Sequence, residues 1–176
     1  MEKGLVHIYT GDGKGKTTSA IGLGIRAFGR GFKVLLAQFL KGMDTGELHV
    51  LKNLGPNFEV YRHKNVKGFF WNMSDEQKAE LKKSVREGFQ HVKEEIEKDK
   101  WDMVILDEIM GTIHNQLIDT REVVELIKNK PDKLELVLTG RNAPKELIEL
   151  ADYVSEISAI KHPWQQGIKA RKGIEF

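Results

Sequence analysis

The residues with the clearest chemistry lie near the start of the chain, where positions 11–18 read G-D-G-K-G-K-T-T. Glycine has no Cβ, so such a loop is free to turn its backbone N–H groups toward phosphate oxygens. Lys16 adds a positive charge, and Thr17 offers a hydroxyl to a magnesium ion shared with the phosphates. The sequence therefore predicts a loop that binds a nucleoside triphosphate, with these contacts: Thr10, Gly11, Asp12, Gly13, Lys14, Gly15, Lys16, Thr17 and Thr18.

The loop departs from the common pattern G-x-x-x-x-G-K-[ST], because Thr10 stands where that pattern has its first glycine. A glycine-rich turn with chance basic residues is the alternative interpretation. The neighbouring segments favour the phosphate-binding one, since an apolar run at 5–9 precedes the loop and a helix-forming stretch follows it.

A second group of oxygen ligands ends the apolar segment 102–108, which closes with Asp107 and Glu108. Proteins with phosphate-binding loops use a carboxylate at this place to hold magnesium, directly or through water. We therefore predict Mg²⁺ ligands at Thr17, Asp107 and Glu108. Glu108 has two possible roles: it polarises water in a hydrolase, or it serves the metal shell or a helix N-terminus in a transferase.

Arg141 follows a third apolar run and is a candidate phosphate or substrate contact, with a surface arginine as the alternative. The aromatic cluster Phe69-Phe70-Trp71 either covers a flat, apolar ligand or plugs the core. The six histidines show no H-x-x-x-H pair, so we assign none of them to a transition metal.

These residues need a scaffold that brings separate chain segments to one edge, and the apolar pattern supplies one. Short apolar runs alternate with helical patterns, which indicates an α/β fold with a mainly parallel sheet of about six strands. The expected strands are 5–9, 33–39, 58–62, 103–106, 134–138 and, more weakly, 153–157. The irregular segments 41–54 and 65–72 follow strands, where open α/β sheets place ligand-binding loops.

The expected helices have recognisable ends. One runs from the phosphate loop to the break at 29–31, and Ser74 with Gln77 forms a capping box that opens a long helix to about Lys100. Asp119 with Glu122 caps a helix through 129, and Pro144 is expected in the first turn of another.

Composition bounds the class of protein. The 176 residues are 40% hydrophobic and 31% charged, which predicts a single domain spanning 1–176 with segment 161–176 packed against it. The net charge of +2 gives no electrostatic footprint for nucleic acid, and the absence of cysteine excludes disulfides and thiolate metal sites. With no secretory signal or membrane-spanning stretch in the sequence, we expect a soluble cytoplasmic protein.

Taken together, the motifs resemble those of the ATP:corrinoid adenosyltransferases of cobalamin biosynthesis, also called cob(I)yrinic acid a,c-diamide adenosyltransferases. The resemblance extends over nearly the whole chain. It rests on the loop 9–18, the blocks 38–42, 46–47, 68–72, 106–108 and 139–144, and the ending 161–162 with 173–176. The 139–144 block and the ending are the most specific of these.

The resemblance implies a P-loop NTPase-like three-layer sandwich that binds ATP in a reversed sense, with C5′ facing the acceptor. A cobalt(I) corrinoid attacks C5′ and releases triphosphate, with Mg²⁺ near Thr17 and Asp107 or Glu108. The corrinoid supplies the nucleophile, so the protein orients, stabilises the leaving group and excludes water. Lys16 is then catalytic, and Phe69 and Trp71 displace the lower axial ligand of cobalt(II), which makes it easier to reduce.

The same resemblance implies a homodimer and a flavoprotein reductant such as flavodoxin. Cobalamin, cobinamide and cobyrinic acid a,c-diamide all stay open as acceptors, because Phe70 replaces a smaller polar residue of some relatives. Some relatives also cover the corrinoid with an N-terminal extension, whereas this chain begins almost at its first strand.

Three other functions compete. A nucleoside-triphosphate hydrolase acting as a motor or switch would use Glu108 to orient water and the basic ending to bind nucleic acid. A corrinoid carrier would bind both molecules without turnover. A small-molecule kinase would fit the loop but would leave the specific ending unexplained.

Overall fold

The computed structural model describes residues 2–42, 44–62 and 70–176, without the side chain of Trp71. Its centre is an open sheet of six parallel strands in the order β3-β2-β4-β5-β1-β6. The strands are β1 (Val6–Thr10), β2 (Val34–Gln38), β3 (Phe58–Arg62), β4 (Met103–Asp107), β5 (Glu135–Thr139) and β6 (Tyr153–Glu156). The predicted α/β fold with a parallel sheet of about six strands is confirmed.

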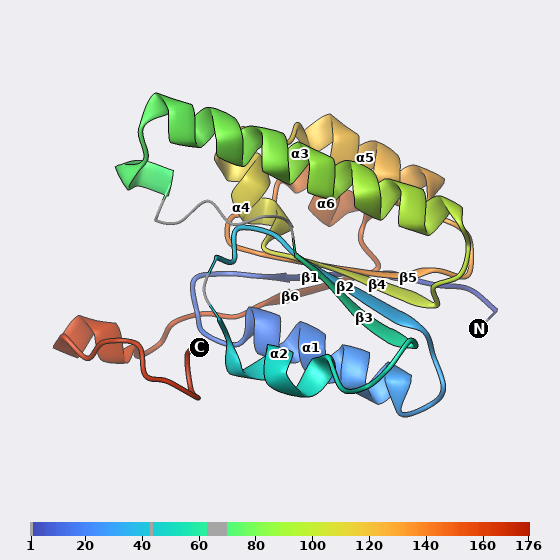
Figure 1. Cartoon of the computed structure of the whole chain (residues 1–176), viewed down its shortest axis with the longest axis horizontal. Helices are drawn as coiled ribbons and strands as arrows, with labels where there is room; N and C mark the ends of the chain where they lie inside the picture. Colours follow the sequence, from blue (N-terminus) through green and yellow to red (C-terminus); the bar gives the residue numbers. More distant parts are fainter. Residues whose placement is uncertain (1, 43, 63–69) are drawn as a thin grey trace.

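Helices cover both faces of the sheet and complete three layers (Figure 1). One face carries α3 (Asp75–Glu97), α4 (Ile109–His114), α5 (Thr120–Asn129) and α6 (Lys145–Leu150), and the other carries α1 (Lys16–Phe28) and α2 (Gly46–Leu51). Two short 3-10 helices, η1 (Phe70–Asn72) and η2 (Pro163–Gln166), lie outside these layers.

The hydrophobic pattern explains the layers. Every residue of β2 and β4 is buried, as expected for central strands covered on both faces. Alternate strand side chains enter two separate cores: Leu35, Val104 and Leu136 pack under α3 and α5, while Leu36 and Ile105 pack against α1. The carboxyl ends of all strands therefore meet at one edge, where the predicted loops lie.

The helix ends agree closely with the sequence. Both predicted capping boxes are present, at Ser74 with Gln77 and at Asp119 with Glu122. Pro144 is the N-cap of α6 rather than a residue of its first turn, since its ψ of 144° is extended and not helical. The helices α2 and α4 were not predicted, and each is only six residues long.

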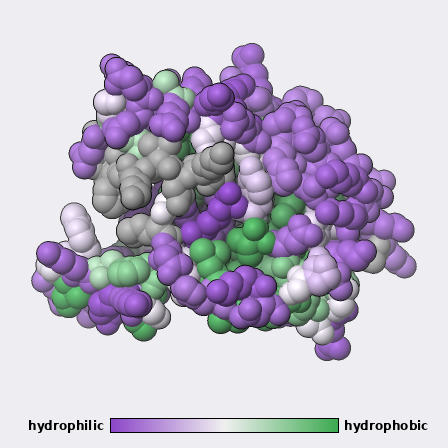
Figure 2. Space-filling model, viewed as in Figure 1, coloured by the Kyte–Doolittle hydropathy of each residue, from purple (hydrophilic) through white to green (hydrophobic). Residues whose placement is uncertain are grey.

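The surface is uneven. Hydrophobic side chains gather over α1 and α2 in the lower half of Figure 2, where Ile25 and Val50 are exposed, whereas the α3 side is hydrophilic. No helix among residues 2–42, 44–62 and 70–176 is long and apolar enough to cross a membrane.

One buried carboxylate stabilises the end of α3 away from the predicted site. Glu95 Oε1 accepts a hydrogen bond from Lys98 Nζ (2.5 Å), and Oε2 accepts one from Trp101 Nε1 (3.0 Å) and lies 2.9 Å from Lys100 Nζ. Burial raises the pKa of the Glu95 carboxyl, but these hydrogen bonds outweigh it and lower the pKa to about 2. Because the pKa is lower in the folded protein, this stabilisation is present above the ordinary pKa and is lost as pH falls toward 2.

We expect Glu95→Gln to lower the free energy of unfolding by about 1–3 kcal/mol at pH 7, because charged hydrogen bonds in a buried site are lost. Urea unfolding should show the difference in stability between parent and variant narrowing below about pH 4, because the Glu95 carboxyl of the unfolded parent takes up its proton there. The exposed neighbour Glu94 provides the control, and Glu94→Gln should stay within about 0.5 kcal/mol of the parent. If the Glu95 variant and the parent had equal free energies of unfolding at pH 7, the stabilising role of the Glu95 carboxylate would be contradicted.

Candidate functional site

The predicted phosphate loop connects β1 to α1 at the carboxyl edge of the sheet. Gly15 has φ of 127°, a backbone conformation that side-chain-bearing residues rarely adopt. Gly11 and Gly13 lie against the backbone of Ile157 and Ser158, where an added Cβ would come within 2.5 to 2.9 Å of the nearest backbone atoms. The glycines are therefore required by the fold as well as by any phosphate.

The segment after β6, residues 157–159, is hydrogen-bonded to the phosphate loop. Gly13 N–H donates to Ile157 O at 2.7 Å, and Ala159 N–H donates to Asp12 Oδ1 at 3.1 Å. The Gly13 amide is thus used within the fold. Thr10, at the position where the common pattern has glycine, is buried, and its Oγ1 accepts a hydrogen bond from Ala143 N–H at 3.3 Å. The side chain at position 10 therefore ties the loop to the segment after β5.

Lys16 folds back over the loop and donates from Nζ to Gly13 O at 2.7 Å. Burial lowers the pKa of Lys16, while the nearby Glu108 carboxylate acts in the opposite direction. A partly desolvated ammonium held beside a ring of backbone groups is well suited to an anion, since its charge is poorly compensated by water.

Asp107 is the centre of the polar network beneath Thr17. Its side chain is 0% exposed, and Oδ1 accepts hydrogen bonds from the hydroxyls of Thr17 and Thr139, both at 2.8 Å. Its Oδ2 lies 2.9 Å from Lys41 Nζ and accepts from Gln38 Nε2 at 3.2 Å. The first turn of α1 and the end of β4 thus bring together Thr17 and Asp107, two of the three predicted metal ligands.

A second layer of polar side chains holds this carboxylate in place. Gln38 Oε1 accepts from Arg62 Nε at 2.7 Å, and Arg62 also donates to Thr45 Oγ1 at 2.9 Å. Gln38, Lys41, Arg62 and Thr139 were not among the predicted site residues. Each lies at or just after the end of an apolar strand, and that position was the available signal.

Glu108 is the N-cap of α4 and has a left-handed backbone conformation, with φ of 62°. This turn separates its side chain from that of Asp107 and places Glu108 at the pocket, where its backbone N–H donates to Thr139 Oγ1 at 2.9 Å. Burial, together with the negative charge of Asp107, raises the pKa of the Glu108 carboxyl.

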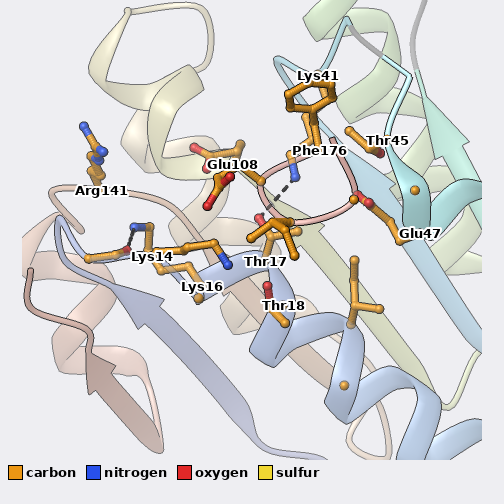
Figure 3. A pocket seen from close by; sticks show the side chains of 18 of the residues that line it. Lys14, Lys16, Thr17, Thr18, Lys41, Thr45, Glu47, Glu108, Arg141 and Phe176 are labelled. Atoms are coloured by element: carbon orange, nitrogen blue, oxygen red, sulfur yellow. Dashed lines mark hydrogen bonds between the residues drawn. The ribbon is translucent and has the colours of Figure 1, made fainter. Parts of the chain in front are cut away.

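The loop opens onto a pocket of about 820 Å³ (Figure 3). Nine of the predicted residues line it: Asp12, Gly13, Lys14, Gly15, Lys16, Thr17, Thr18, Glu108 and Arg141. Figure 3 shows Arg141 well apart from Lys41, on the other side of the pocket. Thr10, Gly11 and Asp107, although described, are not lining residues. The pocket is also lined by Gly173, Ile174, Glu175 and Phe176. Residues near both ends of the sequence, the phosphate loop and 173–176, therefore line the same pocket.

The donor set fits magnesium better than a transition metal. Among residues 2–42, 44–62 and 70–176 no three histidine, aspartate or glutamate side chains lie close enough to hold a metal ion. A threonine hydroxyl and a carboxylate supply hard oxygens, which suit Mg²⁺ when a triphosphate completes its shell. A cation already lies between them, since Lys41 Nζ is 3.2 Å from Thr17 Oγ1 and 2.9 Å from Asp107 Oδ2.

Two predicted catalytic residues are not placed. Phe69 and the side chain of Trp71 lie outside the described residues, although the Trp71 backbone belongs to η1. Most residues of the segment 161–176 are exposed. The prediction of a single domain spanning 1–176, with 161–176 packed against it, stays a prediction.

Comparisons with known proteins give a consistent result. Residues 2–176 match the family model described as ATP:corrinoid adenosyltransferase BtuR/CobO/CobP. The chain is similar to the corrinoid adenosyltransferase of Escherichia coli (strain K12), with 36% identity covering 99% of this chain and 87% of the relative. A corrinoid adenosyltransferase of Sinorhizobium sp. is 40% identical over 99% of this chain and 81% of its own. The corrinoid adenosyltransferase CobA of Salmonella typhimurium (strain LT2) is 34% identical, over 99% of this chain and 87% of its own.

Proposed function

Because this chain belongs to the ATP:corrinoid adenosyltransferase family, we propose that it transfers the 5′-deoxyadenosyl group of ATP to the cobalt(I) of a corrinoid and releases triphosphate. Cobalt(I) supplies the electron pair, the cobalt–carbon bond forms at C5′, and the C5′–O bond breaks with its electrons on the triphosphate. The observation that carries the proposal is the convergence of Lys16, Thr17 and Asp107 beside a pocket of about 820 Å³.

The protein's task in this reaction is orientation and charge stabilisation. Lys16, partly buried and close to Gly13 O, lies where it would neutralise charge on the departing triphosphate. The hydrogen bonds from the segment 157–159 fix the loop, and the fixed loop would hold the phosphates in one place with C5′ facing the acceptor. No side chain is needed as a nucleophile, because the corrinoid provides it.

Magnesium would be held by Thr17 and Asp107, with Glu108 at the pocket as a further or water-mediated ligand. When bound, it would supply Lewis-acid stabilisation of the phosphate oxygens. The wider shell supports this assignment, since Gln38 and Thr139 fix the orientation of the Asp107 carboxylate.

We also propose that Phe69 and Trp71 act on the corrinoid by displacing its lower axial ligand, so that a flavoprotein such as flavodoxin suffices as reductant. Trp71→Ala should then slow reduction of bound cobalt(II) by such a donor by at least about tenfold, because an axial donor raises the energy of the accepting orbital. Anaerobic stopped-flow spectroscopy measures this rate. Transfer to chemically reduced corrinoid should change much less, which separates the reduction step from the alkylation step. A Trp71→Ala protein that is reduced as fast as the parent would refute the role.

A homodimer, as implied by the family resemblance, completes the proposal. Analytical ultracentrifugation of the purified chain, with and without corrinoid, measures it directly.

The deciding experiment for the function is anaerobic incubation with magnesium-ATP and chemically reduced cobalamin. We expect the cobalt(I) absorbance to decay, and a light-sensitive alkylcobalamin and intact triphosphate to form in equal amounts. Orthophosphate without alkylation would instead favour a hydrolase, and polynucleotide stimulation would strengthen that conclusion. Binding of both substrates without turnover would indicate a carrier.

A further inference from the structure

Lys41 lies in the segment between β2 and α2, and its ammonium contacts a buried carboxylate. Its ammonium lies 2.9 Å from Asp107 Oδ2 and 3.2 Å from Thr17 Oγ1, as the dashed line to Thr17 in Figure 3 shows. The Thr17 hydroxyl donates its proton to Asp107 Oδ1, and its oxygen accepts a hydrogen bond from Lys41 Nζ. The ammonium therefore contacts the same two oxygens that suit a divalent cation.

The electrostatics favour a cation at this position. The Asp107 side chain is fully buried, and a buried carboxylate without a positive partner is costly. The hydroxyls of Thr17 and Thr139 and the amide of Gln38 supply hydrogen bonds but no charge. Among the described residues, Lys41 forms the ion pair with Asp107, while the charges of Arg62 and Lys16 add to the attraction.

Lys41 is also able to leave. Its side chain is 21% exposed, it lies in neither a helix nor a strand, and it lines the pocket into which the phosphate loop opens. Two cations cannot share these two oxygens without strong repulsion, because like charges about 4 Å apart near a protein surface repel each other strongly. A triphosphate brings both a divalent ion and enough negative charge to attract the displaced ammonium.

We propose that the Lys41 ammonium holds the place of the magnesium ion between Thr17 and Asp107 until the nucleotide delivers the metal, so that the nucleotide-free protein excludes divalent cations from this pair of oxygens. The inference rests on the proposed function only for the identity of the nucleotide. It makes metal binding conditional on nucleotide binding, and it assigns Lys41 a positioning role in the family reaction.

Titration of Mn²⁺ into the nucleotide-free protein, followed by the loss of the free-ion electron paramagnetic resonance signal, tests the proposal. Lys41→Met should bind Mn²⁺ at least about tenfold more tightly than the parent, because the competing charge is gone. Lys41→Arg keeps the charge and should show no gain, and Lys145→Met, at an exposed lysine outside the pocket, should match the parent. Adding Asp107→Asn to Lys41→Met should abolish the gain.

Lys41→Gln, which keeps a hydrogen-bond donor, is measured in parallel in case the uncompensated carboxylate prevents Lys41→Met from folding; circular dichroism reports on the fold of each. Mn²⁺ affinity of both neutral variants equal to or weaker than that of the parent would overturn the proposal. No nucleotide or corrinoid is present, so failure of adenosyl transfer and failure of this inference are separate outcomes.

Discussion

Lys16→Ala is expected to lower kcat/KM for adenosyl transfer by about 10³-fold or more. The variant loses a charge-assisted contact to phosphate, which is about 1.5–3 kcal/mol in binding. It also loses stabilisation of the negative charge that grows on the leaving triphosphate, and single groups of this kind are each responsible for about 10²–10³-fold in kcat. The position of Lys16 Nζ, 2.7 Å from Gly13 O at the loop, is the structural basis of this expectation.

The measurement is the anaerobic cobalt(I) assay with ATP varied, so that kcat and KM are obtained separately. A fall in kcat as well as a rise in KM would show that Lys16 acts on the leaving group and not only on binding. Lys145→Ala removes an exposed lysine on α6 that lies 3.8 Å from Glu149, and it should leave both constants unchanged. Wild-type activity of a folded Lys16→Ala protein would refute the proposed role.

Asp107→Asn should lower transfer by about 10²-fold or more at any magnesium concentration, because it replaces a charged oxygen ligand by an amide. The substitution is also poorly tolerated in the network. At the place of Oδ2 an amide NH₂ would face two donors, Lys41 Nζ and Gln38 Nε2. At the place of Oδ1 it would force the hydroxyls of Thr17 and Thr139 to turn from donors into acceptors. We expect the free energy of unfolding to fall by about 1–3 kcal/mol in addition to the loss of activity.

The same substitution at the opposite end of β4 is the matched control. Asp102 accepts a hydrogen bond from Lys33 N–H at 2.7 Å, and the remaining oxygen of an asparagine there can still accept it. Asp102→Asn should therefore retain transfer. If Asp107→Asn kept parental activity with the same magnesium dependence, the metal would have to be held elsewhere.

The sequence predicted most of the scaffold, for local reasons. The central strands are short apolar runs, and α3 and α5 each begin with a side chain that caps the helix, at Ser74 and Asp119. The unpredicted helix α4 starts directly after Glu108, which has a left-handed backbone. A glutamate rarely adopts this conformation, so the residue type gave no indication of the turn. The equally short α2 has a regular N-terminus without a side-chain hydrogen bond, so no cap marked it.

The candidate site was predicted where it is contiguous in sequence and missed where it is assembled by the sheet. The loop 10–18 is one uninterrupted motif, whereas Gln38 comes next to Asp107 only because β2 and β4 are neighbours in register. The same strand places Gln38 opposite Arg62 of β3. Strand order is a tertiary property, so the composition of each strand end alone did not show that these polar side chains meet.

The strand order has a consequence for how the protein comes into existence. β1, which leads into the phosphate loop, pairs with β5 and β6, the last two of the six described strands in chain order, so both are synthesised after it. During synthesis β1 therefore stays unpaired until residues such as Leu136 and Tyr153 have been made. Strands so far apart in the sequence also pair slowly. A nascent chain arrested before β5 would carry the complete nucleotide motif and yet have no nucleotide affinity, because neither the neighbours of β1 nor Thr139 would be present.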